Sequence, residues 1–336
     1  MREELKAALE KALGVAVSEP VRLAGGASKE AWAVDAVDGR RLLVRRAGGG
    51  LIHERALSLR EEFELLAAAR EAGVRAPAPV AYLGEVAGRE AFAMERVEGE
   101  TIGRRIVKAP PPGLALQMAE ELAKIHAIPR ERVPFLPDRD VFEALYEDLD
   151  SIGEPHPAIE LGLRWARERI PPARERVVVH GDFRVGNLAV TGEGLAAVLD
   201  WEFAHVGDPA EDVAWPLVRA WRFGRDELRV GGVGELEPYL ARYEELTGRA
   251  IPPEELYAWE VLGNCKWAIG ALRQARRHLR GEERSVELAI LGRLAAEPEY
   301  EILDLVGGRP GRGAGGRTAP PATGGAPPAA GERPSA

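Results

Sequence analysis

The sequence has a single cysteine, Cys265, among its 336 residues. One cysteine cannot form an internal disulfide framework, and it cannot supply a zinc site that needs several cysteines. The chain also has no run of about 18 apolar residues, and its amino terminus, MREELKAALEKALG, is charged and amphipathic. We therefore expect no signal peptide and no membrane span, and a cytoplasmic location fits the cysteine content.

The chain also has no long basic run. Its formal net charge is -9 and its isoelectric point is near 5.4, so nucleic acid and other large polyanions are not expected as partners. With 46% apolar residues, the chain is long enough to bury a sizeable core and to form two lobes or domains. A soluble globular protein is the default expectation.

The first hundred residues have the patterns of an antiparallel strand meander with two helices. Apolar spacing predicts helices over residues 2–13 and 58–72, and β-type runs predict strands over 21–24, 30–37, 41–46, 80–83 and 90–97. The turn after the first strand contains Gly25, Gly26 and Ser28. Such a turn lets backbone N–H groups approach a phosphate closely, although a plain turn explains the same residues.

Beyond a break at residues 98–103 and three prolines at 110–112, the chain is mostly helical. Helices are predicted over 114–129, 138–150, 158–170, 211–221, 235–247 and 253–280. From residue 307 the composition falls to Gly, Pro, Ala, Thr and Arg, which predicts a disordered tail. We therefore divide the chain into residues 1–98, 99–306 and 307–336.

The central stretch, residues 177–212, places four polar residues at fixed intervals: His180, Asp182, Asn187 and Asp200. In a loop between strands, a carboxylate can face a substrate hydroxyl while an amide oxygen reaches a divalent cation. A hairpin through residues 191–194 would return Asp200 beside Asn187, and such oxygen donors suit magnesium. This pattern indicates phosphoryl transfer.

Each of these residues also has a structural explanation. Asp182, Asn187 and Asp200 could form turns, and we expect His180 to brace the loop by hydrogen bonding rather than to act as an acid or a ligand. A purely structural role is favoured for each residue taken alone. For all of them together at these spacings, a functional site is favoured instead. Asp208 and Asp212 are expected to be structural partners of the loop and of the next helix start.

The segments HGDFRVGN and DWE make the resemblance specific. The chain resembles the aminoglycoside phosphotransferase and choline kinase superfamily, in the branch that includes the kinase-like domain attached to some acyl-CoA dehydrogenases. GGASKEAW, LLVRR, LREEFELL and AMERVEGETI contribute to the match, which runs from about residue 21 to about residue 294. The resemblance implies an α+β, protein-kinase-like fold of two lobes: an antiparallel-sheet N-lobe and a mainly helical C-lobe.

The resemblance also implies roles for individual residues. Asp182 would be the base or orienting carboxylate, and Asn187 and Asp200 would bind Mg²⁺. The nucleotide, ATP, would be held by the following residues: Gly25, Gly26 and Ser28 at its phosphates, and Glu95 to Val97 through main-chain contacts at adenine. Glu62 occupies the position of the helix glutamate that pairs with a strand lysine, but LLVRR places Arg45 where that lysine is common. Arginine keeps the charge but has a bulkier, forked geometry.

We expect an ATP- and Mg²⁺-dependent kinase that acts on the hydroxyl of a small molecule. Lys266, Arg273 and Arg277 share a helix stripe, so the acceptor could be an anionic hydroxyacyl compound if the stripe lines the pocket, or the stripe could be a solvated face. The aromatic residues that could line an apolar wall are Trp201, Phe203, Trp259 and Trp267, and two of them are expected in the core. The alternatives are an antibiotic kinase, for example for aminoglycosides, and a catalytically silent nucleotide-binding regulator.

Overall fold

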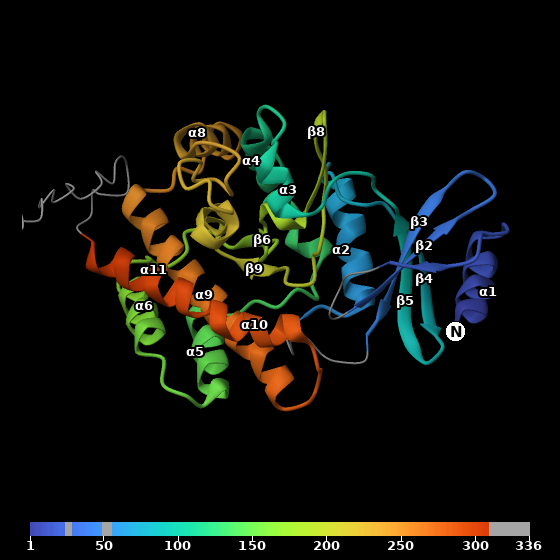
Figure 1. Ribbon diagram of the computed structural model, residues 1–336. Helices are drawn as coiled ribbons and strands as arrows, with labels where there is room; N and C mark the ends of the chain where they lie inside the picture. The colour runs from blue at the N-terminus through green and yellow to red at the C-terminus, as the bar shows by residue number, and fades with distance from the viewer. Residues whose placement is uncertain (24–28, 49–55, 309–336) are drawn as a thin grey trace, which may run out of the picture.

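The computed structural model describes residues 1–23, 29–48 and 56–308. The predicted phosphate turn of Gly25, Gly26 and Ser28 lies outside these residues, as does the predicted tail from residue 309 onward. In the described part, an antiparallel sheet lies beside a larger helical lobe (Figure 1). No helix of this part is long and apolar enough to cross a membrane.

The sheet has five antiparallel strands in the order β1-β2-β3-β5-β4. The strands are β1 (Val21–Arg22), β2 (Lys29–Asp35), β3 (Arg41–Ala47), β4 (Pro79–Val86) and β5 (Arg89–Glu95). Side chains alternate between the two faces of a strand, so Trp32 and Val44, which are cross-strand partners, share a buried face. Ala31 and Arg45 are partners on the opposite face, which looks toward the helical lobe.

One helix lies on each side of this sheet. Helix α1 (Arg2–Leu13) covers the outer face, where Leu5 and Leu9 are completely buried (Figure 1). Helix α2 (Leu59–Glu71) lies between the sheet and the helical lobe, and Ser58 and Glu61 form a capping box at its start. Because α2 is enclosed in this way, its polar residues can serve a site between the lobes.

The chain crosses to the helical lobe after β5. Glu100 and Val190 exchange two backbone hydrogen bonds, of 2.8 and 3.0 Å, which tie the crossing segment to the helical lobe. Gly99 has φ +145°, and a Cβ there would lie 2.9 Å from the nitrogen of Val190, so a side chain would prevent this approach. We propose the predicted boundary after residue 98 as the division between the two lobes.

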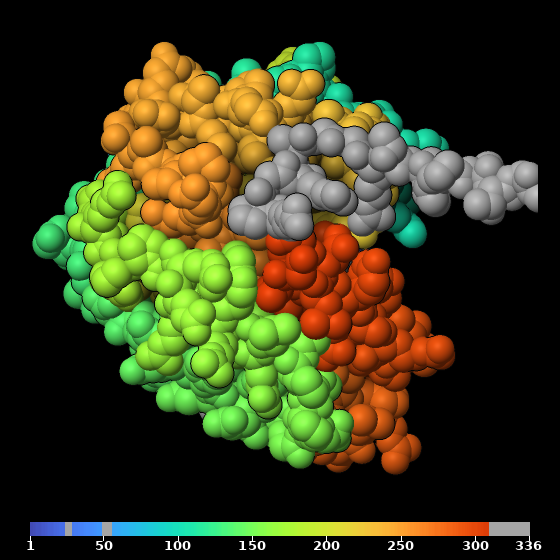
Figure 2. Space-filling view, turned by 90° about the vertical axis from the view of Figure 1, so that its left-hand side faces the viewer, coloured from blue at the N-terminus to red at the C-terminus, as the bar shows by residue number. Residues whose placement is uncertain are grey.

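Among the described residues, the helical lobe also contains two short two-stranded antiparallel sheets, packed between its helices. Its helices are α3 (Gly103–Lys108), α4 (Leu114–Ile125), α5 (Val141–Ile152), α6 (Pro157–Arg167), α7 (Pro209–Ala214), α8 (Leu236–Thr247), α9 (Pro253–Leu279), α10 (Val286–Leu294) and α11 (Ala296–Gly307). Its strands are β6 (Val177–Val179), β7 (Leu188–Thr191), β8 (Gly194–Val198) and β9 (His205–Gly207), paired as β6-β9 and β7-β8. Figure 2 shows the face of this lobe where α6 and α11 pack together.

The chain differs from the sequence-based expectation after α7. A helix was expected over residues 211–221, but α7 ends at Ala214 and two 3₁₀ turns follow, over Trp215–Leu217 and Arg219–Arg222. Pro216 has no backbone N–H to continue a helix, which explains the change. Helices α10 and α11 lie beyond the expected helices, and α11 continues through Gly307, where the tail was expected to begin.

Candidate active site

A cavity of about 1050 Å³ lies between the sheet and the helical lobe. Its lining includes every predicted site residue that the structure describes: Arg45, Glu62, Glu95, Val97, Asp182, Asn187 and Asp200. These side chains come from β3, α2, the end of β5, and the two loops that follow β6 and β8. The fold therefore brings residues more than a hundred positions apart into one cleft.

The loop after β6 has a backbone that requires glycine at its second position. Gly181 has φ +77°, and a Cβ at this residue would lie 2.3 Å from the carbonyl oxygen of Phe203. Asp212 holds the loop, because its carboxylate accepts N–H bonds from His180 at 2.6 Å and from Gly181 at 3.0 Å. Asp212 is thus a structural partner of the loop, as expected, and Asp208 caps the start of α7.

His180 braces the same loop, as the sequence analysis expected. Its Nε2 donates to the carbonyl oxygen of Leu199 at 2.9 Å, and its Nδ1 accepts from the backbone N–H of Asp182 at 3.2 Å. These two bonds require the neutral tautomer with the proton on Nε2. Burial lowers the pKa of His180, although the Asp212 carboxylate opposes it, so neutral His180 fits the hydrogen bonds.

Asp182 is held by three side-chain donors. Its Oδ1 accepts from the indole Nε1 of Trp215 at 2.7 Å and from the Nε of Arg184 at 3.1 Å. Its Oδ2 accepts from the amide Nδ2 of Asn187 at 2.6 Å. The side chain is 17% exposed, so the carboxylate is fixed in direction but remains accessible from the cavity.

Asn187 and Asp200 lie beside each other because of the β7-β8 hairpin. Leu188 pairs with Val198, and the N–H of Leu199 donates to the carbonyl oxygen of Asn187 at 2.8 Å. Asp200 has φ +58°, a conformation that costs a non-glycine residue of the order of 1 kcal/mol or more. Strain of this kind is common at functional sites and here directs the carboxylate into the cleft.

The donor set of these two residues fits magnesium. Asn187 uses its amide nitrogen to bind Asp182, which assigns its Oδ1 to the other side of the amide, where a cation could be bound. Asp200 adds a carboxylate that is 50% exposed. Within the described ranges, no group of three or more His, Cys, Asp or Glu side chains could hold a metal ion. An ion here would depend on phosphate oxygens and water as well, as Mg²⁺ commonly does.

Arg45 and Glu62 are in contact. The Nη1 of Arg45 lies 2.7 Å from Oε1 of Glu62 and 3.1 Å from Oδ1 of Asp200. Burial acts to lower the pKa of Arg45, but the carboxylates of Glu62, Asp200 and Glu202 outweigh it and raise the pKa. Arg45 is therefore a permanent cation that joins the sheet lobe to the predicted metal ligand.

The end of β5 borders the cavity through Glu95 and Val97. The backbone N–H of Glu95 donates to the carbonyl oxygen of Ala78, and that of Arg96 donates to that of Arg41. The N–H groups of Glu95 and Arg96 are thus both occupied by backbone hydrogen bonds at the end of the sheet. The N–H of Val97 makes no hydrogen bond to another described residue, so Val97 is the position in this segment where a backbone donor can face a ligand.

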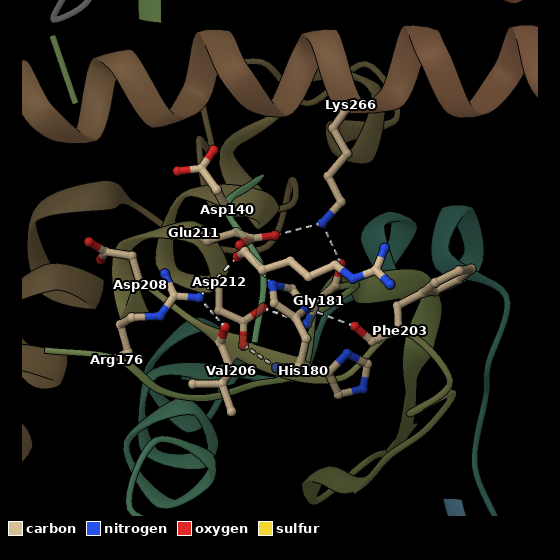
Figure 3. A network of polar contacts seen from close by, with 12 residues as sticks. Asp140, Arg176, His180, Gly181, Phe203, Val206, Asp208, Glu211, Asp212 and Lys266 are labelled. Carbon is tan, nitrogen blue, oxygen red and sulfur yellow. Dashed lines mark hydrogen bonds and ion pairs between the residues drawn. The ribbon is translucent and has the colours of Figure 1, made fainter. Parts of the chain in front are cut away.

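The basic stripe of α9 contacts carboxylates. Lys266 reaches from α9 to the loop after β6 and to α7, where its Nζ lies 2.8 Å from both the carbonyl oxygen of Gly181 and Oε1 of Glu211 (Figure 3). Arg273 pairs with Asp148, and Arg277 pairs with Glu283 at 2.7 Å. Lys266 and Arg273 line the cavity but Arg277 does not. The stripe is therefore neither a solvated face nor an open row of cations.

Three tryptophans, Trp215, Trp221 and Trp267, form a cluster on the side of the cavity opposite the sheet. The ring centroids of Trp221 lie 5.4 Å from Trp215 and 4.8 Å from Trp267. The guanidinium carbon of Arg184 lies 4.6 Å from the Trp221 ring, and the Lys266 ammonium lies 4.9 Å from the Trp215 ring. Two of the aromatic faces are therefore already in contact with cations of the protein.

The four aromatic residues named in the sequence analysis divide as expected. Trp201 and Trp259 are only 1% and 4% exposed and belong to the core. Phe203 and Trp267 are half-buried and line the cavity. Sequence reasoning did not single out Trp215 or Trp221, whose positions depend on the 3₁₀ turns after α7. Pro216 was the available signal, because a proline inside an expected helix ends or kinks it.

Two charged residues of the cleft were also missed. Lys29, at the start of β2, and Glu202, the glutamate of DWE, lie with Nζ and Oε2 2.9 Å apart. Lys29 is part of the segment GGASKEAW that contributes to the resemblance, but the resemblance implied no role for it. Glu202 had a signal, since it is the third residue of the DWE segment that carries the resemblance.

Most of the chain matches a known protein family. Residues 19–253 match the model of the "Phosphotransferase enzyme family". Acyl-CoA dehydrogenase family member 10 of Mus musculus is 25% identical over 291 residues, which cover 76% of this chain and 26% of that protein. The chain thus spans about a quarter of the length of this relative.

Solved structures show the same fold. A provisionally assigned aminoglycoside phosphotransferase from Ralstonia eutropha has a TM-score of 0.73 at 20% identity, with 91% of this chain and 98% of that chain covered. A spectinomycin phosphotransferase, solved with ADP and spectinomycin, has a TM-score of 0.65 at 13% identity, with 90% and 98% covered. These likenesses confirm the α+β, protein-kinase-like fold of two lobes. Because the family model matches well over half of the chain, the chain belongs to the phosphotransferase enzyme family.

Proposed function

We propose that the chain is an ATP- and Mg²⁺-dependent phosphotransferase that transfers the γ-phosphate to a hydroxyl group of a small molecule. The observation that carries this proposal is the Asp182 carboxylate, which faces the cavity and is held by Trp215, Arg184 and Asn187. A carboxylate fixed in this way can orient an acceptor hydroxyl and take its proton. The ADP complex of the spectinomycin phosphotransferase supports a nucleotide in this cleft.

Different residues of this chain have different roles in the proposed reaction. Asn187 and Asp200 would hold Mg²⁺, which when bound neutralises charge on the phosphates. Arg45 supplies a fixed positive charge beside Asp200, and Val97 offers a backbone N–H at the end of β5. Asp182 binds the acceptor hydroxyl proton at its carboxylate. The protein itself forms no covalent intermediate in this scheme, since positioning and electrostatic stabilisation account for most of such catalysis.

For the acceptor we propose an anionic hydroxyacyl-type compound. A polycationic acceptor needs carboxylates or open aromatic faces. On this wall Asp148 pairs with Arg273 and Glu211 with Lys266, while Trp215 and Trp221 carry cations of the protein. The guanidinium of Arg184 is 25% exposed and adjoins Asp182, so it can bind an acidic group of the acceptor. The resemblance to the acyl-CoA dehydrogenase relatives supports the same class.

The experiment is a screen of the purified chain for ATP consumption with Mg²⁺ against hydroxylated acids, acyl thioesters, sugars and aminoglycosides. Product formation is verified by mass spectrometry. Asp182→Ala is expected to lower kcat by about 10²- to 10⁴-fold. Asp150→Ala, at an exposed position of α5, is the matched control.

Each alternative gives a distinct result in this screen. Turnover that Asp182→Ala leaves intact contradicts the assigned base. Activity on aminoglycosides alone, without activity on anionic acceptors, identifies an antibiotic kinase and overturns the acceptor class. Nucleotide binding without any turnover identifies a silent regulator. GTP is tested beside ATP, because Val97 and Glu95 act through backbone atoms that either base can contact.

A further inference from the structure

Five charged side chains of the cleft form a chain of alternating sign: Glu202, Lys29, Glu62, Arg45 and Asp200. The successive contacts are 2.9, 2.7, 2.7 and 3.1 Å long. Glu62 is the middle member and is 1% exposed, whereas Asp200 at one end is 50% exposed. Three carboxylates therefore face two cations, and the excess negative charge lies where a divalent cation is expected.

Lys29 and Arg45 reach Glu62 from one face of the sheet. Ala31 is the cross-strand partner of Arg45, and Lys29 lies two residues before Ala31 on β2. Side chains two apart on a strand share a face, so Lys29 lies diagonally across from Arg45. Both side chains line the cavity, and they are 10% and 12% exposed. Glu62 thus pairs with two cations where the resemblance led us to expect one.

We propose that Lys29 is a nucleotide-phosphate-binding residue, and that it supplies the ammonium group that the β3 position lacks because Arg45 stands there. This inference rests on the proposed function. Arg45 directs Nη1 at both Glu62 and Asp200, and its planar fork suits the role of linking these carboxylates. Lys29 carries a compact charge with three donors, which can turn toward a phosphate while still near Glu62.

Lys29 and Glu202 are close enough to form an ion pair, but the contact is not a well-formed hydrogen bond. Nζ and Oε2 lie 2.9 Å apart, but this Glu202 oxygen makes no contact of hydrogen-bond geometry with any described residue. Glu62, in comparison, accepts a well-formed hydrogen bond from Lys29 at 2.7 Å. Lys29 has three N–H donors, so it can donate to a phosphate oxygen the hydrogen bond that Glu202 does not accept, while Glu62 keeps the side chain in position.

Equilibrium binding separates this role from a structural one. Isothermal titration calorimetry is carried out with AMP-PNP and Mg²⁺ and, separately, with adenosine, which has no phosphate. Lys29→Met is expected to weaken AMP-PNP binding by about tenfold or more, to leave adenosine binding unchanged, and to raise KM for ATP more than it lowers kcat. Lys29→Arg is expected to recover most of the AMP-PNP affinity. Lys6→Met, which removes an exposed lysine of α1, is the control.

Lys29→Met leaves two carboxylates without their cation, so Lys29→Met combined with Glu202→Gln serves as the second variant. It removes the same ammonium with less uncompensated charge and is expected to show the same selective loss. Equal AMP-PNP affinity in wild type and both variants overturns the role of Lys29 and leaves the proposed function intact. Equal losses for AMP-PNP and adenosine also overturn it. Wild-type protein that binds no AMP-PNP and shows no turnover contradicts the proposed function and the inference together.

Discussion

The two walls of the cleft are built by different means. The wall formed by β2, β3, α2 and the loop after β8 is ionic, and its charged side chains contact one another in alternating sign. The opposite wall, formed by the 3₁₀ turns after α7 and by α9, is aromatic. Three of the five charged side chains of the ionic wall come from strands or a helix, whereas two of the three tryptophans of the aromatic wall come from 3₁₀ turns. In the proposed scheme, the nucleotide side is therefore constrained mainly by backbone geometry and the acceptor side mainly by side-chain packing.

The largest effect is expected from a substitution in the loop after β6, which lies between the two walls. Gly181→Ala introduces a Cβ only 2.3 Å from the carbonyl oxygen of Phe203, at φ +77°. We expect activity to fall by more than about 100-fold and the free energy of unfolding to fall by about 3 kcal/mol or more. Turnover assays and urea denaturation measure the two effects.

Gly192→Ala is the matched control for that variant. Gly192 lies between β7 and β8 and has no atom within 4 Å of an added Cβ. It should therefore keep stability and turnover near the wild-type values. If Gly181→Ala behaves like Gly192→Ala, the close approach of the loop to Phe203 is wrong.

A smaller effect is expected where the aromatic wall contacts Asp182, the proposed base. Trp215→Phe removes the 2.7 Å hydrogen bond from the indole to Asp182 but retains an aromatic ring. Loss of one hydrogen bond to a charged group corresponds to about 1.5–3 kcal/mol, so kcat should fall by about tenfold or more. The affinity for AMP-PNP should not change. Steady-state kinetics combined with calorimetry gives both quantities.

Trp165→Phe is a suitable control because Trp165 lies on α6, outside the cleft lining. An equal drop in kcat for both variants would attribute the effect to general destabilisation. A drop in nucleotide affinity with Trp215→Phe would show instead that the aromatic wall also serves the nucleotide, which would remove the distinction between the walls.

Trp221→Leu tests the aromatic wall without removing any of the three hydrogen-bond donors of Asp182. Trp221→Leu removes the ring that lies against the Arg184 guanidinium, at 4.6 Å, while Trp215 stays in place. A cation–π contact of this kind contributes about 0.5–2 kcal/mol. We therefore expect KM for the acceptor to rise severalfold, with KM for ATP unchanged. A rise in KM for ATP alone would show that Trp221 serves the nucleotide and not the acceptor, which would contradict the proposed division of the cleft.

The sequence predicted the parts of this cleft that depend on short-range spacing. Asp182, Asn187 and Asp200 are brought together by one loop and one hairpin, so their intervals carry most of the geometry. The antiparallel meander and α2 could be predicted for the same reason, since strand alternation and helical periodicity are local patterns. The segment LLVRR also placed Arg45 where a lysine is common, with Glu62 as its expected partner.

The rest depends on contacts between distant segments. Lys29 and Glu202 are 173 positions apart, and nothing in either neighbourhood indicates the other. The carboxylate partners of Lys266 and Arg273 come from α7 and α5, so the stripe on α9 could not be distinguished from an open basic surface. Trp215 reaches Asp182 only because Pro216 replaces the expected helix with 3₁₀ turns.

The smallest expected effect concerns His205, which lies beside Gly181 in the loop after β6 and lines the cavity. Its Nδ1 faces the carbonyl oxygen of Phe203 at 2.9 Å and its Nε2 faces Glu211 at 3.1 Å, so both nitrogens donate when the ring is charged. Burial acts to lower the pKa of His205, but Glu211 outweighs it and raises the pKa above 6.5.

A raised pKa in the folded state means that protonated His205 stabilises the fold. This stabilisation is complete below the ordinary pKa of 6.5 and is lost as the pH rises through the higher pKa of the folded protein. The free energy of unfolding of wild type should therefore exceed that of His205→Gln most at about pH 6, and the difference should shrink by about pH 9. Urea denaturation of both proteins across this range measures it. A difference that stays constant or grows with pH would mean that His205 is neutral in the folded protein, and that Lys266 alone balances Glu211 between the two walls.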